Sequence, residues 1–247
     1  MTGSELVSMA YKRPPITEAV IGINFSTPIS KKDLGATDKK LSAHYPQHQG
    51  VSNYSLAVAL PSQTTANVGR EDGHRRSTAD MTQLVVLWPS SFIVSQLAPY
   101  QGWEHFFERF ARDWSALKRV TGFREISRVG VRYINRVDIP AKEPIVEYER
   151  FLNIYPKIPD SLQPTSSYAL QAAVELKEID CLLRLNSAPV PSPLLQYASF
   201  LIDQDISRQA NAPQNDNEIY ELLQKIHVVK NAVFEACITA KTREFFQ

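Results

Sequence analysis

The stretch that most constrains the fold of this chain is Glu125–Pro140, near its middle. Successive side chains of an extended chain point to opposite faces, so this stretch separates into an apolar side and a charged side. The apolar side carries Val129, Val131, Tyr133, Val137 and Ile139, and the other side carries Arg128, Arg132 and Arg136. The pattern predicts a central strand that ends at Pro140, because proline cannot donate a hydrogen bond to a strand ladder.

Asn135 interrupts the apolar side of this strand, between Tyr133 and Val137. A buried amide without a hydrogen-bond partner costs about 1 to 3 kcal/mol. We therefore expect its side chain to bond backbone groups at a bulge or helix end beside the strand, fixing the register where two halves of the chain meet, rather than to contact a substrate.

Before the central strand, apolar residues alternate or recur at helical spacing in several segments. The predicted elements are a strand over residues 19–25, a helix from Lys31 to His44 with Leu34, Ala36 and Leu41 facing inward, a strand over 54–60, a hairpin of 84–88 and 92–96, and an amphipathic helix from Trp103 to Thr121. In the last helix, Glu104, Glu108, Arg109, Arg112 and Lys118 are expected to face water.

The stretch from residue 61 to 80 is predicted to be a long polar loop, which makes it a candidate for binding. It contains the charged run Arg70–Arg76, in which Arg75 and Arg76 are candidate binding residues.

After the central strand the order of elements repeats. Strands at residues 168–176, 181–186 and 199–206 precede a long helix that Asn215, Asp216 or Asn217 could cap. We predict an α+β fold, one compact domain of two β-α-β-β-β-α halves (about 16–122 and 123–247). The strands would form one curved antiparallel sheet with both long helices on one face. Coincidence in an α+β chain is the alternative to duplication.

Composition limits the classes of function. The chain has 247 residues, 43% of them hydrophobic, which is enough for a sizeable core, and a net charge of +1, which gives no global basic field. Its two cysteines, Cys181 and Cys237, show no metal-binding or disulfide spacing. No segment has the apolar length of a signal sequence or a membrane span, so we expect a cytoplasmic protein without membrane association.

Three short motifs stand in order along the chain: Pro14-Pro-Ile-Thr-Glu-Ala-Val20, Arg132-Tyr-Ile-Asn-Arg136, and Phe234-x3-Ile-Thr-x3-Arg-Glu-Phe245. With these motifs the chain resembles an uncharacterised, sporadically distributed family of prokaryotic proteins. The resemblance covers nearly the whole length and is most specific at the central Tyr-Ile-Asn-Arg. That family has no assigned activity, cofactor or catalytic residue, so the resemblance implies no mechanism.

The three arginines of the central strand lie at four-residue steps, about 13 Å apart, which is too far to bind one phosphate together. They are arranged to follow a polyanion or to pair with carboxylates on neighbouring strands, and pairing is the default where both charges occur in one sheet. Asp203, Asp205, Glu175 and Asp138 are the candidate partners.

Asp203 and Asp205 also have the spacing of paired carboxylates for a divalent metal or for acid–base chemistry, although no further ligand or base can be placed beside them from the sequence. The pair His44 and His48 has metal-like spacing, but Pro46 breaks the helix that would align them. No nucleophile elbow, phosphate loop or zinc-protease motif occurs. We therefore predict neither a metal nor a cofactor.

The sequence thus favours a non-enzymatic binding or regulatory protein that recognises a macromolecular partner, most simply a protein, through an exposed sheet face and the loop. The binding candidates are Arg128, Arg132, Arg136, Arg75 and Arg76. The alternative is a metal-assisted hydrolase or nuclease that uses Asp203 and Asp205. A third hypothesis is nucleic-acid binding by the arginine face, which predicts an affinity that falls steeply with salt.

Overall fold

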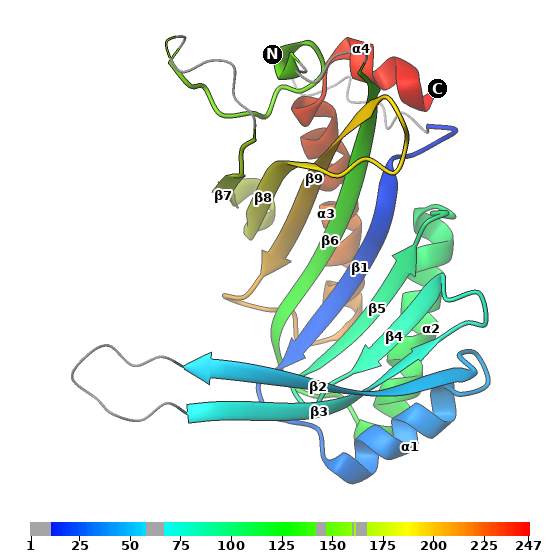
Figure 1. The fold of residues 1–247 in the computed structure, drawn as a ribbon. Helices are drawn as coiled ribbons and strands as arrows, with labels where there is room; N and C mark the ends of the chain where they lie inside the picture. The colour runs from blue at the N-terminus through cyan, green and yellow to red at the C-terminus, as the bar shows by residue number, and fades with distance from the viewer. Residues whose placement is uncertain (1–10, 58–66, 142–146, 160, 162–166) are drawn as a thin grey trace. The chain divides into compact units, whose positions relative to one another are not determined.

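A computed structural model describes residues 11–57, 67–141, 147–159, 161 and 167–247. The fold is α+β, as predicted, with one nine-stranded antiparallel sheet in the order β2-β3-β4-β5-β1-β6-β9-β8-β7 (Figure 1). The strands are β1 (Ile16–Phe25), β2 (Gln47–Ala57), β3 (Asn67–Ser77), β4 (Gln83–Leu87), β5 (Ser91–Leu97), β6 (Ile126–Pro140), β7 (Leu170–Leu176), β8 (Cys181–Val190) and β9 (Tyr197–Arg208). The helices are α1 (Lys31–Leu41), α2 (Trp103–Thr121), α3 (Asp216–Cys237) and α4 (Ala240–Arg243), with 3₁₀ turns η1 (Tyr148–Arg150), η3 (Lys177–Ile179) and η4 (Glu244–Phe246).

The chain divides into two compact units. Unit 1 holds the residues up to Ala19, Ala98–Tyr100 and the residues from Gly130 on, and unit 2 holds Val20–Leu97 and Gln101–Val129. Strands β1 and β6 each contribute to both units. The boundary between the two units therefore falls within β1 and β6. The predicted halves, about 16–122 and 123–247, would instead separate before β6.

Strand β6 matches its prediction. Val129, Val131, Tyr133, Val137 and Ile139 are all buried, while Arg132 on the other side is exposed. Asn135 is buried among them, and its amide donates a hydrogen bond to the backbone oxygen of Ile202 at 3.1 Å. The predicted backbone bond is confirmed, but its acceptor lies in strand β9 and not at a helix end.

In unit 2, helix α2 is amphipathic as predicted, and Gly122 caps its end. Its aromatic stripe, which is buried, comprises Trp103, Phe106, Phe110 and Trp114. One residue differs: Arg109, expected to face water, is only 6% exposed. Helix α1 ends at Leu41, three residues before the predicted end, and buries Thr37 where Ala36 was expected. The backbone oxygen of Leu41, at the end of this helix, accepts a hydrogen bond from Tyr45 N at 3.0 Å.

The prediction of a polar loop from 61 to 80 is wrong for residues 67–77, which form strand β3 and pair along β2. Strand β4 pairs with β3 only between His74 and Ser77, so the rest of β3 pairs with β2 alone. Figure 1 shows the two strands extending as a ribbon beyond β4. A two-stranded ribbon has no core to cover, so its sequence lacks the apolar alternation that identifies buried strands. Residues 58–60 of the predicted strand lie outside the described residues.

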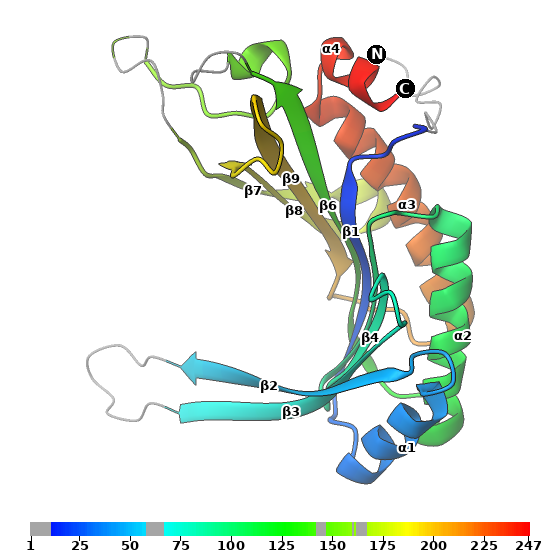
Figure 2. The same ribbon diagram turned by 45° about the vertical axis from the view of Figure 1, so that its right-hand side comes forward.

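In unit 1, the three predicted strands correspond to β7, β8 and β9, and Asn215 caps α3 by accepting from Glu218 N at 3.0 Å. Helix α3 packs along one face of these strands (Figure 2). Four strands stand between α1 and α2, whereas three stand between β6 and α3, and the turn η1 follows β6 where a helix was expected. The halves therefore differ in element order, and duplication stays a prediction. Within the described residues, no helix is long and apolar enough to cross a membrane.

Candidate functional site

Two of the three arginines predicted on the central strand, Arg132 and Arg136, lie in unit 1. Arg132 forms a fork with Asp203, with both nitrogen–oxygen distances at 2.8 Å, and this bond raises the pKa of the guanidinium. Asn186, opposite Asp203 on β8, donates to the same carboxylate at 3.1 Å. Both oxygens of Asp203 are therefore engaged by protein donors, which is the cross-strand pairing that the sequence analysis gave as the default.

The other two arginines have different surroundings. Arg136 pairs with Asp138, two residues along the same strand, at 3.0 Å, and Ser199 also donates to Asp138. Arg128 belongs to unit 2, where its guanidinium lies over Gly22 of β1. Asp205 lies opposite Arg184 and contributes electrostatically to the raised pKa of Arg132. The structure thus brings Arg132 and Asp203 together. Arg128, Arg132 and Arg136 do not share one site.

The two arginines predicted in the loop lie on β3 and point to opposite sides of it. Arg75 donates to Gln49 on β2 at 3.2 Å, and Arg76 turns toward α1 and forms a fork with Asp38, at 2.6 and 2.7 Å. Arg76 also donates to the backbone oxygen of Tyr45 at 3.1 Å. Arg76 therefore holds α1 to the ribbon and is not displayed to a partner.

A pocket of about 480 Å³ lies in unit 1 where the chain before β1, the end of β6, the loop 191–196 between β8 and β9, and the last residues of the chain meet. We call it the loop pocket. Its lining includes Arg13, Arg136, Asp138, Leu194 and Tyr197. Among the described residues, the side chain of Arg13 has no hydrogen-bonding partner. Arg13, Arg136 and Asp138 are the charged side chains of the described lining, which therefore carries a net positive charge.

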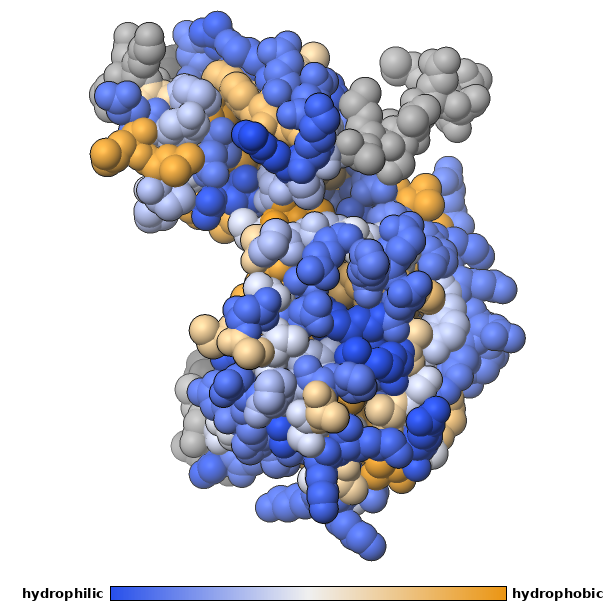
Figure 3. All heavy atoms as spheres, turned by 90° about the vertical axis from the view of Figure 1, so that its right-hand side faces the viewer, coloured by the Kyte–Doolittle hydropathy of each residue, from blue (hydrophilic) through white to orange (hydrophobic). Residues whose placement is uncertain are grey.

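The loop at the rim of this pocket presents apolar side chains to water. Leu195 is 93% exposed, and its neighbours Leu194 and Tyr197 are 48% and 40% exposed. The backbone is nevertheless held in place: Gln196 has a left-handed φ of 61°, and its oxygen accepts from Ala141 N at 2.8 Å. On the face of the molecule drawn in Figure 3, by contrast, hydrophilic residues predominate and apolar ones form small separate patches.

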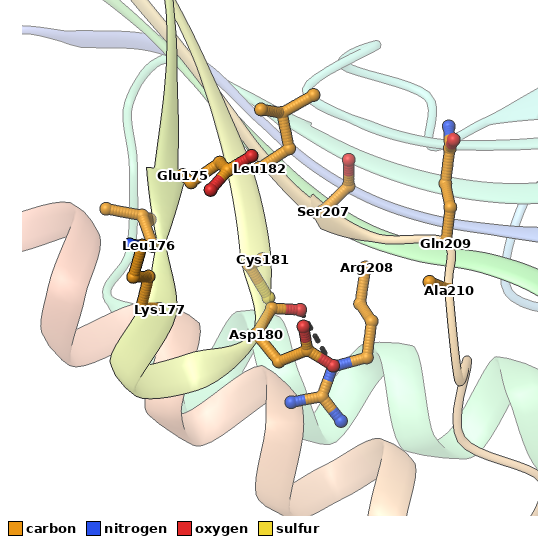
Figure 4. A pocket seen from close by; sticks show the side chains of 10 residues that line it. All are labelled: Glu175, Leu176, Lys177, Asp180, Cys181, Leu182, Ser207, Arg208, Gln209 and Ala210. Carbon is orange, nitrogen blue, oxygen red and sulfur yellow. Dashed lines mark hydrogen bonds between the residues drawn. The ribbon is translucent and has the colours of Figure 1, made fainter.

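A second pocket, of about 410 Å³, lies at the turn between β7 and β8 (Figure 4). Arg208 crosses it and donates to the backbone oxygens of Ile179 and Asp180, at 2.6 and 3.2 Å. Cys181 lines it, but burial raises the pKa of its thiol, so the thiol stays protonated and is a poor nucleophile. Ser207 is buried there, and its hydroxyl has no partner among the described residues.

Sequence reasoning missed a buried polar network in unit 2. The Tyr45 hydroxyl donates to Asp113 at 2.5 Å and accepts from Arg109 and Arg112, at 3.0 and 3.1 Å. Burial raises the pKa of both Tyr45 and Asp113. A signal was present, because Arg109 and Asp113 fall on the same helical face as Phe106, Phe110 and Leu117. The members of this buried network bond one another, so we assign the network a structural role.

Comparisons with known proteins leave the function open. No family model matches the chain, and no curated protein matches it. Among solved structures, the chain is similar to DynU16, a protein in the dynemicin biosynthetic locus, with 12% identity over 88% of this chain and 96% of that chain. The TM-score is 0.23, at which the likeness supports no conclusion about fold or function.

Proposed function

We propose that this chain is a non-enzymatic binding protein that recognises a protein partner through the loop pocket and the loop 191–196. The observation that carries the proposal is the near-complete exposure of Leu195 on a loop whose last residue, Gln196, is hydrogen-bonded to Ala141. Displaying a leucine in water has no stabilising effect on the folded chain, whereas burial in a partner would contribute about 1.5 to 3 kcal/mol. Tyrosine and arginine are the side chains enriched at binding hot spots, and Tyr197 and Arg13 line the pocket beside this loop.

The charge of the pocket indicates the chemistry of the partner. In the described lining, two positive charges, on Arg13 and Arg136, exceed the one negative charge of Asp138. The apolar side chains of Leu194 and Tyr197 lie beside them. A partner segment with an apolar side chain next to an Asp, a Glu or a chain-terminal carboxylate would satisfy both parts of the pocket.

The two alternative functions are less well supported. The hydrolase hypothesis needs further metal ligands beside Asp203, but no cluster of three His, Cys, Asp or Glu ligands found among the described residues includes it. Nucleic-acid binding needs a displayed row of arginines, whereas Arg132, Arg136 and Arg76 each pair with a carboxylate. A thermal shift with magnesium, manganese or zinc that Asp203→Ala abolishes would revive the first of these hypotheses.

The test compares Leu195→Asp with Val228→Asp in affinity purifications from cells that carry the tagged full-length chain. Val228 is the matched control, because it is 67% exposed on α3, away from the loop pocket. We expect the protein that copurifies with the wild type to fall at least about tenfold with Leu195→Asp and to persist with Val228→Asp. Arg13→Glu, which reverses the unpaired charge, should also lower its yield.

Both variants change exposed positions, so their melting temperatures should match that of the wild type, and this is measured first. If Leu195→Asp and Val228→Asp copurify the same proteins in the same amounts, the loop is not the binding surface and the proposal is wrong.

A further inference from the structure

Three potential metal ligands from separate elements of unit 2 meet at the base of the β2–β3 ribbon. They are Asp38 of α1, His48 of β2 and His74 of β3, whose ligand atoms all lie within 4.8 Å of one another. His48 Nε2 is 3.1 Å from His74 Nδ1 and 3.8 Å from Asp38 Oδ1. His48 has metal-like spacing from His44 in the sequence, but its neighbour in space is His74.

The strand register brings the two histidines together. His48 lies opposite Arg76 and His74 lies opposite Gly50, so the imidazoles are diagonal neighbours across the ribbon. Gly50 leaves open space beside them, because a Cβ added there would meet no atom within 4 Å. Asp38 reaches the same place from α1 because Arg76 holds its carboxylate.

The spacing of these atoms fits a tetrahedral metal. Bonds of about 2.0 to 2.1 Å at tetrahedral angles place neighbouring ligand atoms about 3.3 Å apart. The two separations from His48 Nε2, 3.1 and 3.8 Å, lie on either side of that value. The third separation, between the ligand atoms of His74 and Asp38, is at most 4.8 Å, so the exposed imidazole of His48 and the half-buried imidazole of His74 would shift to close the site around an ion.

We propose that Asp38, His48 and His74 form a binding site for a borderline divalent metal ion, with zinc as the best match. Two imidazoles and one carboxylate are a ligand set that zinc accepts, and the fourth position would be left to water or to a group from outside. The ion would join α1 to both strands of the ribbon. This assignment is independent of the proposed binding function, which rests on unit 1.

The charge of Arg76 sets the expected strength of the site. It neutralises the carboxylate of Asp38, so the affinity should be lower than at a site with an uncompensated carboxylate. Each carboxylate oxygen still has a lone pair free for a metal, and a bonded partner behind a ligand orients it. The site is also reachable, because the side chain of His48 is 43% exposed.

The test titrates zinc chloride into the full-length chain, stripped of metal and freed of any histidine tag, by isothermal calorimetry. Cobalt is the spectroscopic probe, because tetrahedral coordination gives it visible absorption bands. We expect one zinc per chain, and an affinity about tenfold or more lower for His48→Ala and for His74→Ala. His44→Ala is the matched control, since His44 is exposed near the same helix end and outside the cluster.

The two histidine variants alter exposed or half-buried positions and avoid the buried Asp38, so folded protein is expected for each and is checked by circular dichroism. The proposal is overturned if the wild type shows no saturable zinc binding. It is equally overturned if His48→Ala and His74→Ala bind zinc as the wild type does.

Discussion

Lys230 is the least favourably placed charged side chain among the described residues. It lies on α3, is 8% exposed, and its Nζ is 3.9 Å from the centre of the Tyr133 ring, without a hydrogen bond or ion pair among the described residues. Burial lowers its pKa from 10.5 to about 7. Between these two values the unfolded chain binds a proton that the folded chain does not, so stability rises with pH across that range.

Replacing Lys230 by methionine, which keeps the length of the side chain and removes the charge, should therefore stabilise the protein. We expect a gain of about 1 to 3 kcal/mol near neutral pH, reduced by the loss of the contact with Tyr133. The gain should shrink as the pH rises from about 7 toward 9.5, because the free energy of removing the proton that the unfolded wild type carries falls as the pH approaches 10.5. Urea unfolding at both values measures it. A difference that is independent of pH would show that Lys230 is not titrating in the core.

For single side chains, the sequence predicted the position of those that follow the strand or helix period. It missed those whose contacts come from residues distant in the sequence. Val129, Tyr133 and Asn135 were placed correctly because strand period alone decides their side. Arg109 was placed in water because its partners, Tyr45 and the backbone oxygen of Ser95, are distant in sequence. The role of His48 depends on the register of β2 and β3, which no local pattern specifies.

Among the elements, the β2–β3 ribbon departs most from what the sequence indicated. Trp88 packs over Gly73 of β3, where an added Cβ would lie 2.6 Å from its ring and 2.5 Å from the backbone oxygen of Leu87. Only glycine allows that approach. The close contact ties the ribbon to the β4–β5 hairpin next to the stretch that pairs with β2 alone.

Gly73→Ala should accordingly destabilise the protein by about 1 to 3 kcal/mol, because either Trp88 or the backbone must move. Gly50→Ala, across the same ribbon, is the matched control, since nothing lies within 4 Å of its added Cβ. Melting temperatures of the two variants beside the wild type make the comparison. If both variants melt at the same temperature, the close packing of Trp88 on Gly73 does not contribute to stability as predicted.

Considering the whole chain, the α+β class and most elements followed from the sequence, since hairpins, caps and the aromatic stripe of α2 are local signals. The order of the nine strands did not, because it depends on pairings between distant segments such as β1 with β6 and β6 with β9. The loop pocket was not foreseen for the same reason: its lining comes from both ends of the chain and from two strand ends between them.

The proposed function requires a protein partner to bind at the loop 191–196. The most direct measurement places a photo-crosslinking amino acid at position 195 and, in a second strain, at position 228, both exposed, and irradiates cells that carry the full-length chain. We predict a discrete crosslinked species from position 195 and none from position 228, with a partner peptide that holds an apolar residue beside a carboxylate. Equal crosslinking from both positions, or none from position 195, would contradict the claim.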